Sequence, residues 1–111
     1  MGLDITHKTF SGSYSSFNSW RKIIAWEMGI DLVQMEGFGG DKSWTPFENL
    51  DLYPLLNHED CDGILTPSEC SKIIRGLAKV NFPDQETSEI ALQFIEGCKL
   101  AISKNENLEF K

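Results

Sequence analysis

The sequence predicts an α+β fold that is mostly helical, with three main helices and short terminal strands that could pair. Three stretches repeat apolar residues at helical spacing, and residues typical of helix starts or ends border them. Alternating β-forming residues occur near the two ends of the chain. At 111 residues, 41% of them hydrophobic, the chain fits a single globular domain over residues 1–111.

One strand and one helix are expected in the first part of the chain. Residues 2–5, GLDI, predict a short strand, and the polar stretch TFSGSYSS at residues 9–16 predicts a loop. A hydroxyl cap at Ser15 or Ser16 would start the helix, and Gly29 would end it. Apolar residues three and four apart form its buried face: Phe17, Trp20, Ile24 and Met28.

The middle of the chain predicts loops and little helix. Residues 37–44, GFGGDKSW, are rich in glycine but lack the spacing of a phosphate-binding loop. We expect a surface loop there, held to the core by Phe38 and Trp44. Pro54 limits the following apolar segment to about one turn of helix.

Two helices and a short strand are expected after residue 66. Thr66, Pro67 and Glu69 form a capping-box pattern that starts a helix running to about Val80. Asp84 can cap the last helix, and LEF at residues 108–110 predicts a strand that could pair with GLDI. The buried side of the last helix is expected to carry Ile90, Phe94, Ile95, Cys98, Ala101 and Ile102.

The charge of the chain bears on its partners. Seventeen acidic against ten basic residues give a net charge of -7, which opposes binding to nucleic acid and to anionic membranes. The same charge suits a cation or a basic protein partner. The sequence contains neither a signal-peptide pattern nor a long apolar run, so we expect a cytoplasmic protein without a membrane partner.

Residues 58–70, HEDCDGILTPSEC, fit the register of an EF-hand calcium-binding loop. With Gly63 at the sixth of twelve places, the ligand places fall on His58, Asp60, Asp62, the Ile64 carbonyl, Thr66 and Glu69. Alternate residues on a tightly curled backbone point their oxygens at one centre, and the glycine permits the bend. The loop therefore predicts a single calcium site built from these six residues.

The match to the EF-hand register is imperfect, and some of its residues also have a second interpretation. His58 offers nitrogen where a hard cation prefers carboxylate oxygen, so calcium binding is expected to be weak. Thr66 and Glu69 are also the two partners of the capping box, which would explain them without a metal. Both interpretations need the same Glu69 carboxylate.

The cysteines and histidines allow further alternatives. His58, Cys61 and Cys70 could supply three zinc ligands, with His7, Cys98 or a carboxylate as the fourth. Three cysteines without an export signal favour reduced thiols, although Cys61 and Cys70 could oxidise to a disulfide. No cysteine or histidine lies in a recognisable nucleophile motif, so we expect no enzymatic activity.

Several segments together carry a family resemblance: GLDI, YSSFNSWR, GFGG, LLNHEDCDGILTPSEC and AISKNENLEF. Over nearly the whole chain they resemble a group of small uncharacterised bacterial and phage-borne proteins, and the DCDG…EC segment is the most specific part. The resemblance implies a shared fold and a shared loop, without a substrate or catalytic residue.

Two functions are compatible with these patterns. The first is a non-enzymatic binding module whose EF-hand-like loop takes up calcium weakly. The second is an acidic protein-interaction factor, of the immunity or phage anti-host type, whose loop is structural and free of metal. The net charge of -7 and the small size favour a basic protein as the partner in the second case.

Overall fold

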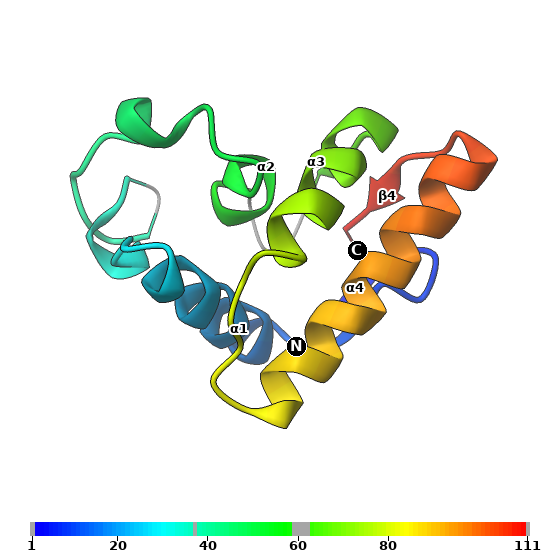
Figure 1. Cartoon of the computed structure of the whole chain (residues 1–111), viewed down its shortest axis with the longest axis horizontal. Helices are drawn as coiled ribbons and strands as arrows, with labels where there is room; N and C mark the ends of the chain where they lie inside the picture. Colours follow the sequence, from blue (N-terminus) through cyan, green and yellow to red (C-terminus); the bar gives the residue numbers. More distant parts are fainter. Residues whose placement is uncertain (1, 37, 59–62, 111) are drawn as a thin grey trace.

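The computed structural model describes three stretches of the chain: residues 2–36, 38–58 and 63–110 (Figure 1). In chain order, the elements are β1 (Gly2–Ile5), β2 (Phe10–Ser13), α1 (Tyr14–Glu27), the 3-10 turns η1 (Leu32–Gln34) and η2 (Thr45–Phe47), α2 (Tyr53–Leu56), β3 (Ile64–Leu65), α3 (Pro67–Leu77), α4 (Gln85–Lys104) and β4 (Leu108–Glu109). The strands form two small antiparallel sheets. The predicted α+β class with three main helices is therefore confirmed.

The chain begins with a hairpin of β1 and β2 that leads directly into α1. His7 and Lys8 form its turn with positive φ angles of 65° and 58°. The prediction of a loop over residues 9–16 is wrong for Phe10–Ser13, which form β2. Phe10 is buried with its ring centroid 5.1 Å from that of Phe17, so one aromatic contact anchors a strand of otherwise small residues.

The cap of α1 lies slightly earlier than predicted. The Ser13 hydroxyl accepts a hydrogen bond from the backbone N–H of Ser16 at 3.0 Å, so the helix starts at Tyr14. At the other end Gly29 adopts a positive φ of 80°, as expected of a residue that terminates a helix. The ends of α1 thus follow from capping chemistry.

The long segment between α1 and α2 is held to the core by Trp44. This side chain is 5% exposed, and its indole N–H donates to the Glu36 carbonyl at 3.0 Å. The Phe38 ring lies beside it, with 6.1 Å between the ring centroids. The prediction that these two aromatic residues anchor the loop is confirmed, as is the single turn of helix around Pro54.

The last helix is capped as predicted but is less buried than expected. Asp84 accepts a hydrogen bond from the Thr87 N–H at 2.8 Å, and this bond holds the pKa of the Asp84 carboxyl below its usual value. The buried residues of α4 include Phe94 and Cys98, whereas Ile102 is 38% exposed. α3 ends at Leu77, before the expected Val80.

The two ends of the chain meet without forming a sheet of their own. β4 pairs with β3, with Leu65 opposite Leu108, while β1 pairs with β2. A single bridge between Ile5 and Phe110 joins β1 to the C-terminal segment. The predicted pairing of GLDI with LEF is thus reduced to one residue pair, because each strand has a nearer partner.

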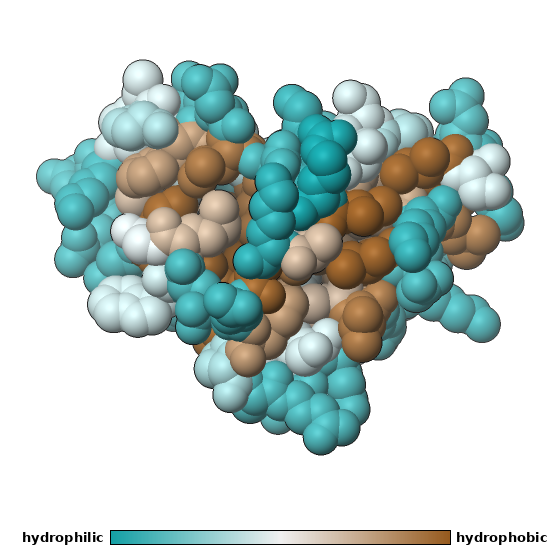
Figure 2. All heavy atoms as spheres, viewed as in Figure 1, coloured by the Kyte–Doolittle hydropathy of each residue, from teal (hydrophilic) through white to brown (hydrophobic). Residues whose placement is uncertain are grey.

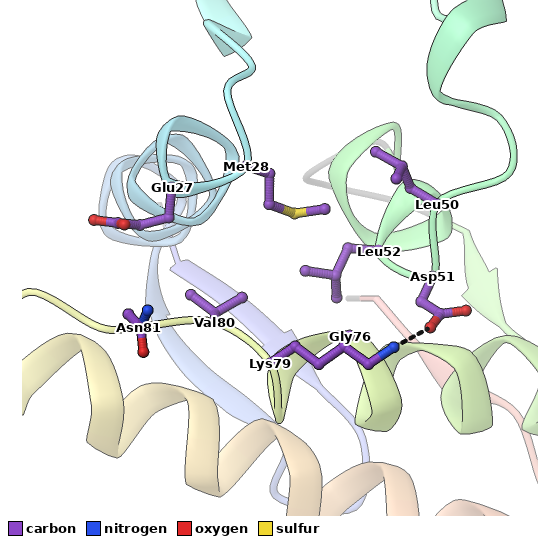
Figure 3. A pocket seen from close by; sticks show the side chains of 9 residues that line it. All are labelled: Glu27, Met28, Leu50, Asp51, Leu52, Gly76, Lys79, Val80 and Asn81. Atoms are coloured by element: carbon purple, nitrogen blue, oxygen red, sulfur yellow. Dashed lines mark ion pairs between the residues drawn. The ribbon is translucent and has the colours of Figure 1, made fainter.

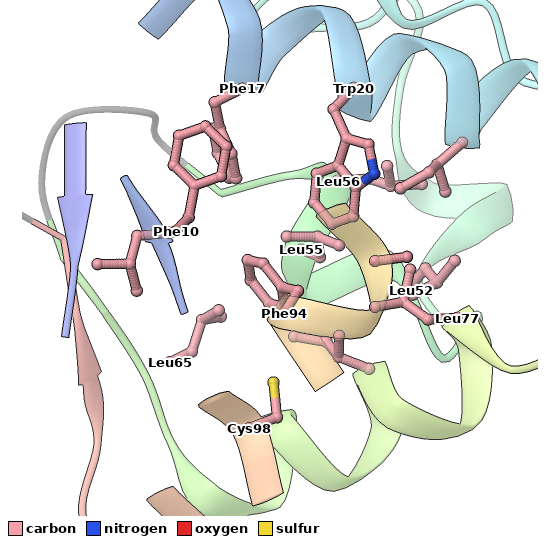
Figure 4. Packing of buried hydrophobic residues seen from close by; sticks show 14 of the residues in the cluster. Phe10, Phe17, Trp20, Leu52, Leu55, Leu56, Leu65, Leu77, Phe94 and Cys98 are labelled. Carbon is pink, nitrogen blue, oxygen red and sulfur yellow. The ribbon is translucent and has the colours of Figure 1, made fainter. Parts of the chain in front are cut away.

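The core lies between α1 and the α3–α4 pair (Figure 4). Aromatic rings form its centre, with the Trp20 and Phe94 ring centroids 5.3 Å apart and the Trp20 N–H donating to the Thr87 carbonyl. Figure 2 shows hydrophobic surface on both sides of a polar ridge that follows α3. Within residues 2–36, 38–58 and 63–110, no helix is long and apolar enough to cross a membrane.

Candidate functional site

Four of the six predicted metal ligands fall within the described residues: His58, Ile64, Thr66 and Glu69. Asp60 and Asp62 lie outside them, as does Cys61. Gly63 has a positive φ of 103°, which fits a glycine at a sharp bend. The sequence after Gly63 runs into β3 and then into the start of α3.

His58 binds within the loop and stacks on the C-terminal segment. Its ring Nε2 lies 2.9 Å from the Ile64 carbonyl oxygen, which can only accept, so Nε2 carries the hydrogen. The His58 ring also stacks on Phe110, with centroids 4.1 Å apart and planes 25° apart. The backbone N–H of Phe110 donates to the Gly63 carbonyl at 3.0 Å. Two predicted metal ligands, His58 and Ile64, therefore bind each other.

The other two described ligands are also bonded to each other. The Thr66 N–H donates to Glu69 Oε1 at 2.9 Å, and the Glu69 N–H donates to the Thr66 hydroxyl at 3.2 Å. This is the complete capping box that the sequence predicted at the start of α3. The Glu69 carboxylate is folded back on its own helix.

A buried arginine supports the start of the same loop. Arg21, on α1, is 1% exposed, and its Nη1 donates to the carbonyls of Leu55, at 3.3 Å, and His58. Its Nη2 donates to the side chain of Asn18. The guanidinium also lies over the Phe17 ring, 4.8 Å from its centroid. A positive charge is thus held against the first residue of the predicted calcium loop.

The role of Arg21 was not predicted from the sequence. A signal was present, because Arg21 lies four residues after Phe17 and three before Ile24, within the apolar stripe of α1. A charged residue in such a stripe is either exposed at its edge or buried with partners. Its carbonyl partners come from the far end of α2, so only the tertiary structure identifies them.

Cys70, Cys98 and His7 have partners away from the loop. Cys70 and Cys98 are both buried and reduced, and a hydrogen bond from Cys98 lowers the pKa of Cys70. His7 Nε2 lies 2.8 Å from a Glu106 carboxylate oxygen. Among the residues that the structure describes, no three histidine, cysteine or acidic side chains come together in a group that could hold a metal.

A hollow of about 220 Å³ lies at the C-terminal end of α1, and we call it the α1 hollow. Figure 3 shows the apolar side chains of Met28, Leu50, Leu52 and Val80 around it. Gly76 of α3 also lines it; a Cβ there would lie 2.5 Å from Leu52 Cγ. The close contact of α3 with the segment before α2 therefore depends on this glycine.

Charged groups flank the α1 hollow unevenly. At one end Asp51 pairs with Lys79, 3.9 Å away, and with Arg75, 3.4 Å away. At the other end, beside Asn81, lies the exposed Glu27 (Figure 3). The Glu27 side chain has no hydrogen-bond or ion-pair partner among the described residues. Negative charge is thus unbalanced at the Glu27 end.

An exposed tryptophan lies one residue before Glu27. Trp26 is 69% exposed, more than any other large hydrophobic side chain that the structure describes. It borders a second, open hollow of about 390 Å³, the Trp26 hollow, which Glu27 and Pro83 also line. Trp26 lies outside the apolar stripe of α1, and its exposure was not predicted from the sequence. A tryptophan on the polar face of an amphipathic helix was the available signal.

Comparisons of the chain with protein-family models, with curated proteins and with solved structures find no match.

Proposed function

We propose that the protein is a non-enzymatic binding module that takes an apolar side chain of a basic protein partner into the α1 hollow. The observation that carries the proposal is the apolar wall of Met28, Leu50 and Val80, which the chain itself covers only in part. At about 220 Å³ the hollow suits one large side chain, whereas small-molecule pockets usually measure roughly 300–1,000 Å³.

The charge of the chain supports a basic partner. The net charge is -7, and the exposed Glu27 at the edge of the α1 hollow adds local negative charge. Complementary charge speeds association and excludes acidic competitors, while a buried apolar side chain supplies most of the affinity. The proposed partner therefore presents an apolar side chain next to lysine or arginine.

The test is selection of short random peptides displayed on phage, followed by calorimetry on the enriched sequences. We expect enrichment of peptides that combine a large apolar residue with Lys or Arg. Val80→Arg, which fills the α1 hollow, should weaken binding at least about tenfold, equivalent to 1.4 kcal/mol. Ala78→Arg adds the same charge at an exposed position outside the hollow and should leave the affinity within about twofold.

Salt and folding provide the remaining controls. Affinity should fall as salt rises from about 0.05 M to about 0.5 M, because exposed charges become screened. Both variants should melt cooperatively, which shows that Val80→Arg acts on the hollow and leaves the fold intact. Enrichment of acidic peptides, or equal binding by Val80→Arg and Ala78→Arg, would contradict the proposal.

Weak calcium binding by the loop is the second candidate function, supported by the positive φ of Gly63 at the sixth place of the register. The ligands would be His58, Asp60, Asp62, the Ile64 carbonyl, Thr66 and Glu69. A bound ion would compete with His58 for the Ile64 carbonyl and with Thr66 for the Glu69 carboxylate. Because these groups are already hydrogen-bonded within the chain, we rank this candidate below the first.

Calorimetry separates the two candidates. If the loop binds calcium, millimolar calcium should release heat and raise the melting temperature, and Glu69→Gln should abolish both effects. If the loop is structural, calcium should leave the melting temperature unchanged in the native chain and in Glu69→Gln alike.

A further inference from the structure

The α1 hollow and the Trp26 hollow share two borders. Glu27, at the end of α1, lines both. The linker between α3 and α4 also contributes to both, with Val80 and Asn81 in the α1 hollow and Pro83 in the Trp26 hollow. The two hollows are therefore neighbours on one face, with Glu27 on their common boundary.

The charges along this face leave the common boundary negative. Three carboxylates and two lysines line the two hollows: Glu27, Asp31, Asp51, Lys22 and Lys79. Asp51 pairs with Lys79 at 3.9 Å and with Arg75, which lines neither hollow, at 3.4 Å, so no negative charge is left over at that end. Glu27 and Asp31 then face a single base, Lys22, which leaves the boundary suited to a positive group.

The Trp26 hollow supplies an apolar surface of a different shape. The Trp26 indole is 69% exposed, and Ile23, Ile30 and Pro83 lie around it. Tryptophan is enriched among the residues that contribute most to binding at protein interfaces, because a large ring can be buried with little loss of side-chain entropy. An open surface of this kind suits a second apolar side chain that lies flat on the ring.

We propose that the two hollows form one site for an extended segment of the partner with the order apolar, basic, apolar. The first apolar side chain enters the α1 hollow, a lysine or arginine pairs with Glu27, and the second apolar side chain packs on Trp26. This inference rests on the proposed binding of a basic partner at the α1 hollow and specifies the sequence pattern recognised there.

The test is a double-mutant cycle on the tightest binder from the random-peptide selection, measured with the full chain by calorimetry. Trp26→Ser should weaken this peptide about tenfold, and Glu27→Gln should weaken it about fivefold. When the basic residue of the peptide is replaced by leucine, Glu27→Gln should have no further effect. Glu86→Gln, an exposed carboxylate of α4 that lines neither hollow, should leave the affinity unchanged.

The outcomes distinguish this inference from the proposed function. If Val80→Arg abolishes binding while Trp26→Ser and Glu27→Gln do not change it, the α1 hollow binds alone and the two-hollow inference is wrong. If Glu27→Gln weakens the leucine-substituted peptide as strongly as the original, the basic residue does not pair with Glu27, and the inference is also wrong. If no peptide is enriched, or Val80→Arg changes nothing, both proposals fail.

Discussion

The loop around residues 58–69 and the face formed by the two hollows differ in how their chemical groups are used. In the loop, the described candidate ligands bind within the chain: His58 to Ile64, and Thr66 to Glu69. On the face with the hollows, apolar side chains such as Trp26 remain uncovered. The loop carried the more obvious sequence motif, yet those of its polar groups that the structure describes are already hydrogen-bonded within the chain.

This difference shows why a motif of suitable residue types does not by itself define a site. The same oxygen that can coordinate an ion can also cap a helix, and the capping box satisfies backbone groups that would otherwise lack partners. An exposed tryptophan makes no such local bond. Its surface stays exposed, which is why we rank the face with the two hollows above the loop as the candidate binding site.

The largest effect expected in the loop region is at Arg21, which supports the start of the loop. Arg21→Met should lower the free energy of unfolding by about 3 kcal/mol, because the Leu55 and His58 carbonyls lose a buried donor. Urea unfolding measures the change. Lys22→Met, on the exposed neighbour, should stay within about 0.5 kcal/mol. Equal, small effects for both variants would show that the loop does not depend on Arg21.

A smaller effect is expected at the start of α3. Thr66→Ala should lower the free energy of unfolding by about 1 kcal/mol, because the Glu69 N–H loses its capping oxygen. Glu69→Gln should cost much less, since glutamine can replace glutamate in a capping box. Urea unfolding without calcium compares the two. A larger loss for Glu69→Gln than for Thr66→Ala would mean that the negative charge of Glu69 has a role beyond the cap.

The loss of stability at acid pH should depend on whether a carboxylate is hydrogen-bonded in the folded state. The Asp84 pKa is lowered in the folded state by its bond from Thr87, so its contribution to stability is present above the ordinary pKa of 3.8 and is lost as pH falls below it. Asp84→Asn keeps a capping side chain but removes this titration. The variant should therefore lose less stability than the native chain between about pH 5 and about pH 2.

Glu27→Gln is the matched control for this measurement, because the Glu27 side chain has no partner among the described residues. It should retain the full acid sensitivity of the native chain. Thermal unfolding across the pH range provides the measurement. Identical curves for Asp84→Asn and the native chain would refute the role assigned to the Asp84 cap.

The smallest effect on stability is expected for a substitution on the face with the two hollows. Trp26→Ser should change the free energy of unfolding by no more than about 0.5 kcal/mol, because a 69% exposed side chain contributes little burial. Trp20→Ser, in the core, should cost at least about 3 kcal/mol. Chemical denaturation separates the two tryptophans. A large loss of unfolding free energy for Trp26→Ser would mean that Trp26 supports the fold. Trp26 could then not be assigned to binding on the face with the two hollows.

Local patterns predicted the main helices and the strands β1 and β4, but missed β2, β3 and the way the strands pair. The caps at Thr66 and Asp84 and the terminating Gly29 depend on neighbours within a few residues, so the sequence reveals them directly. β2 escaped prediction because Phe10 is its single large apolar residue, and its burial depends on Phe17. Strand partners are likewise set by distant residues, as the pairing of Leu65 with Leu108 shows.

The α+β class, the main helices, the capping box and the net negative charge can be read from the amino-acid sequence. Packing in three dimensions was needed to show that His58 binds Ile64 and stacks on Phe110, that Arg21 supports the loop, and that Trp26 lines a hollow next to the α1 hollow. The difference comes from the distance along the chain over which each interaction acts. Helix periodicity and capping act over three or four residues, whereas hydrogen-bond partners, burial and hollows arise where distant segments pack together.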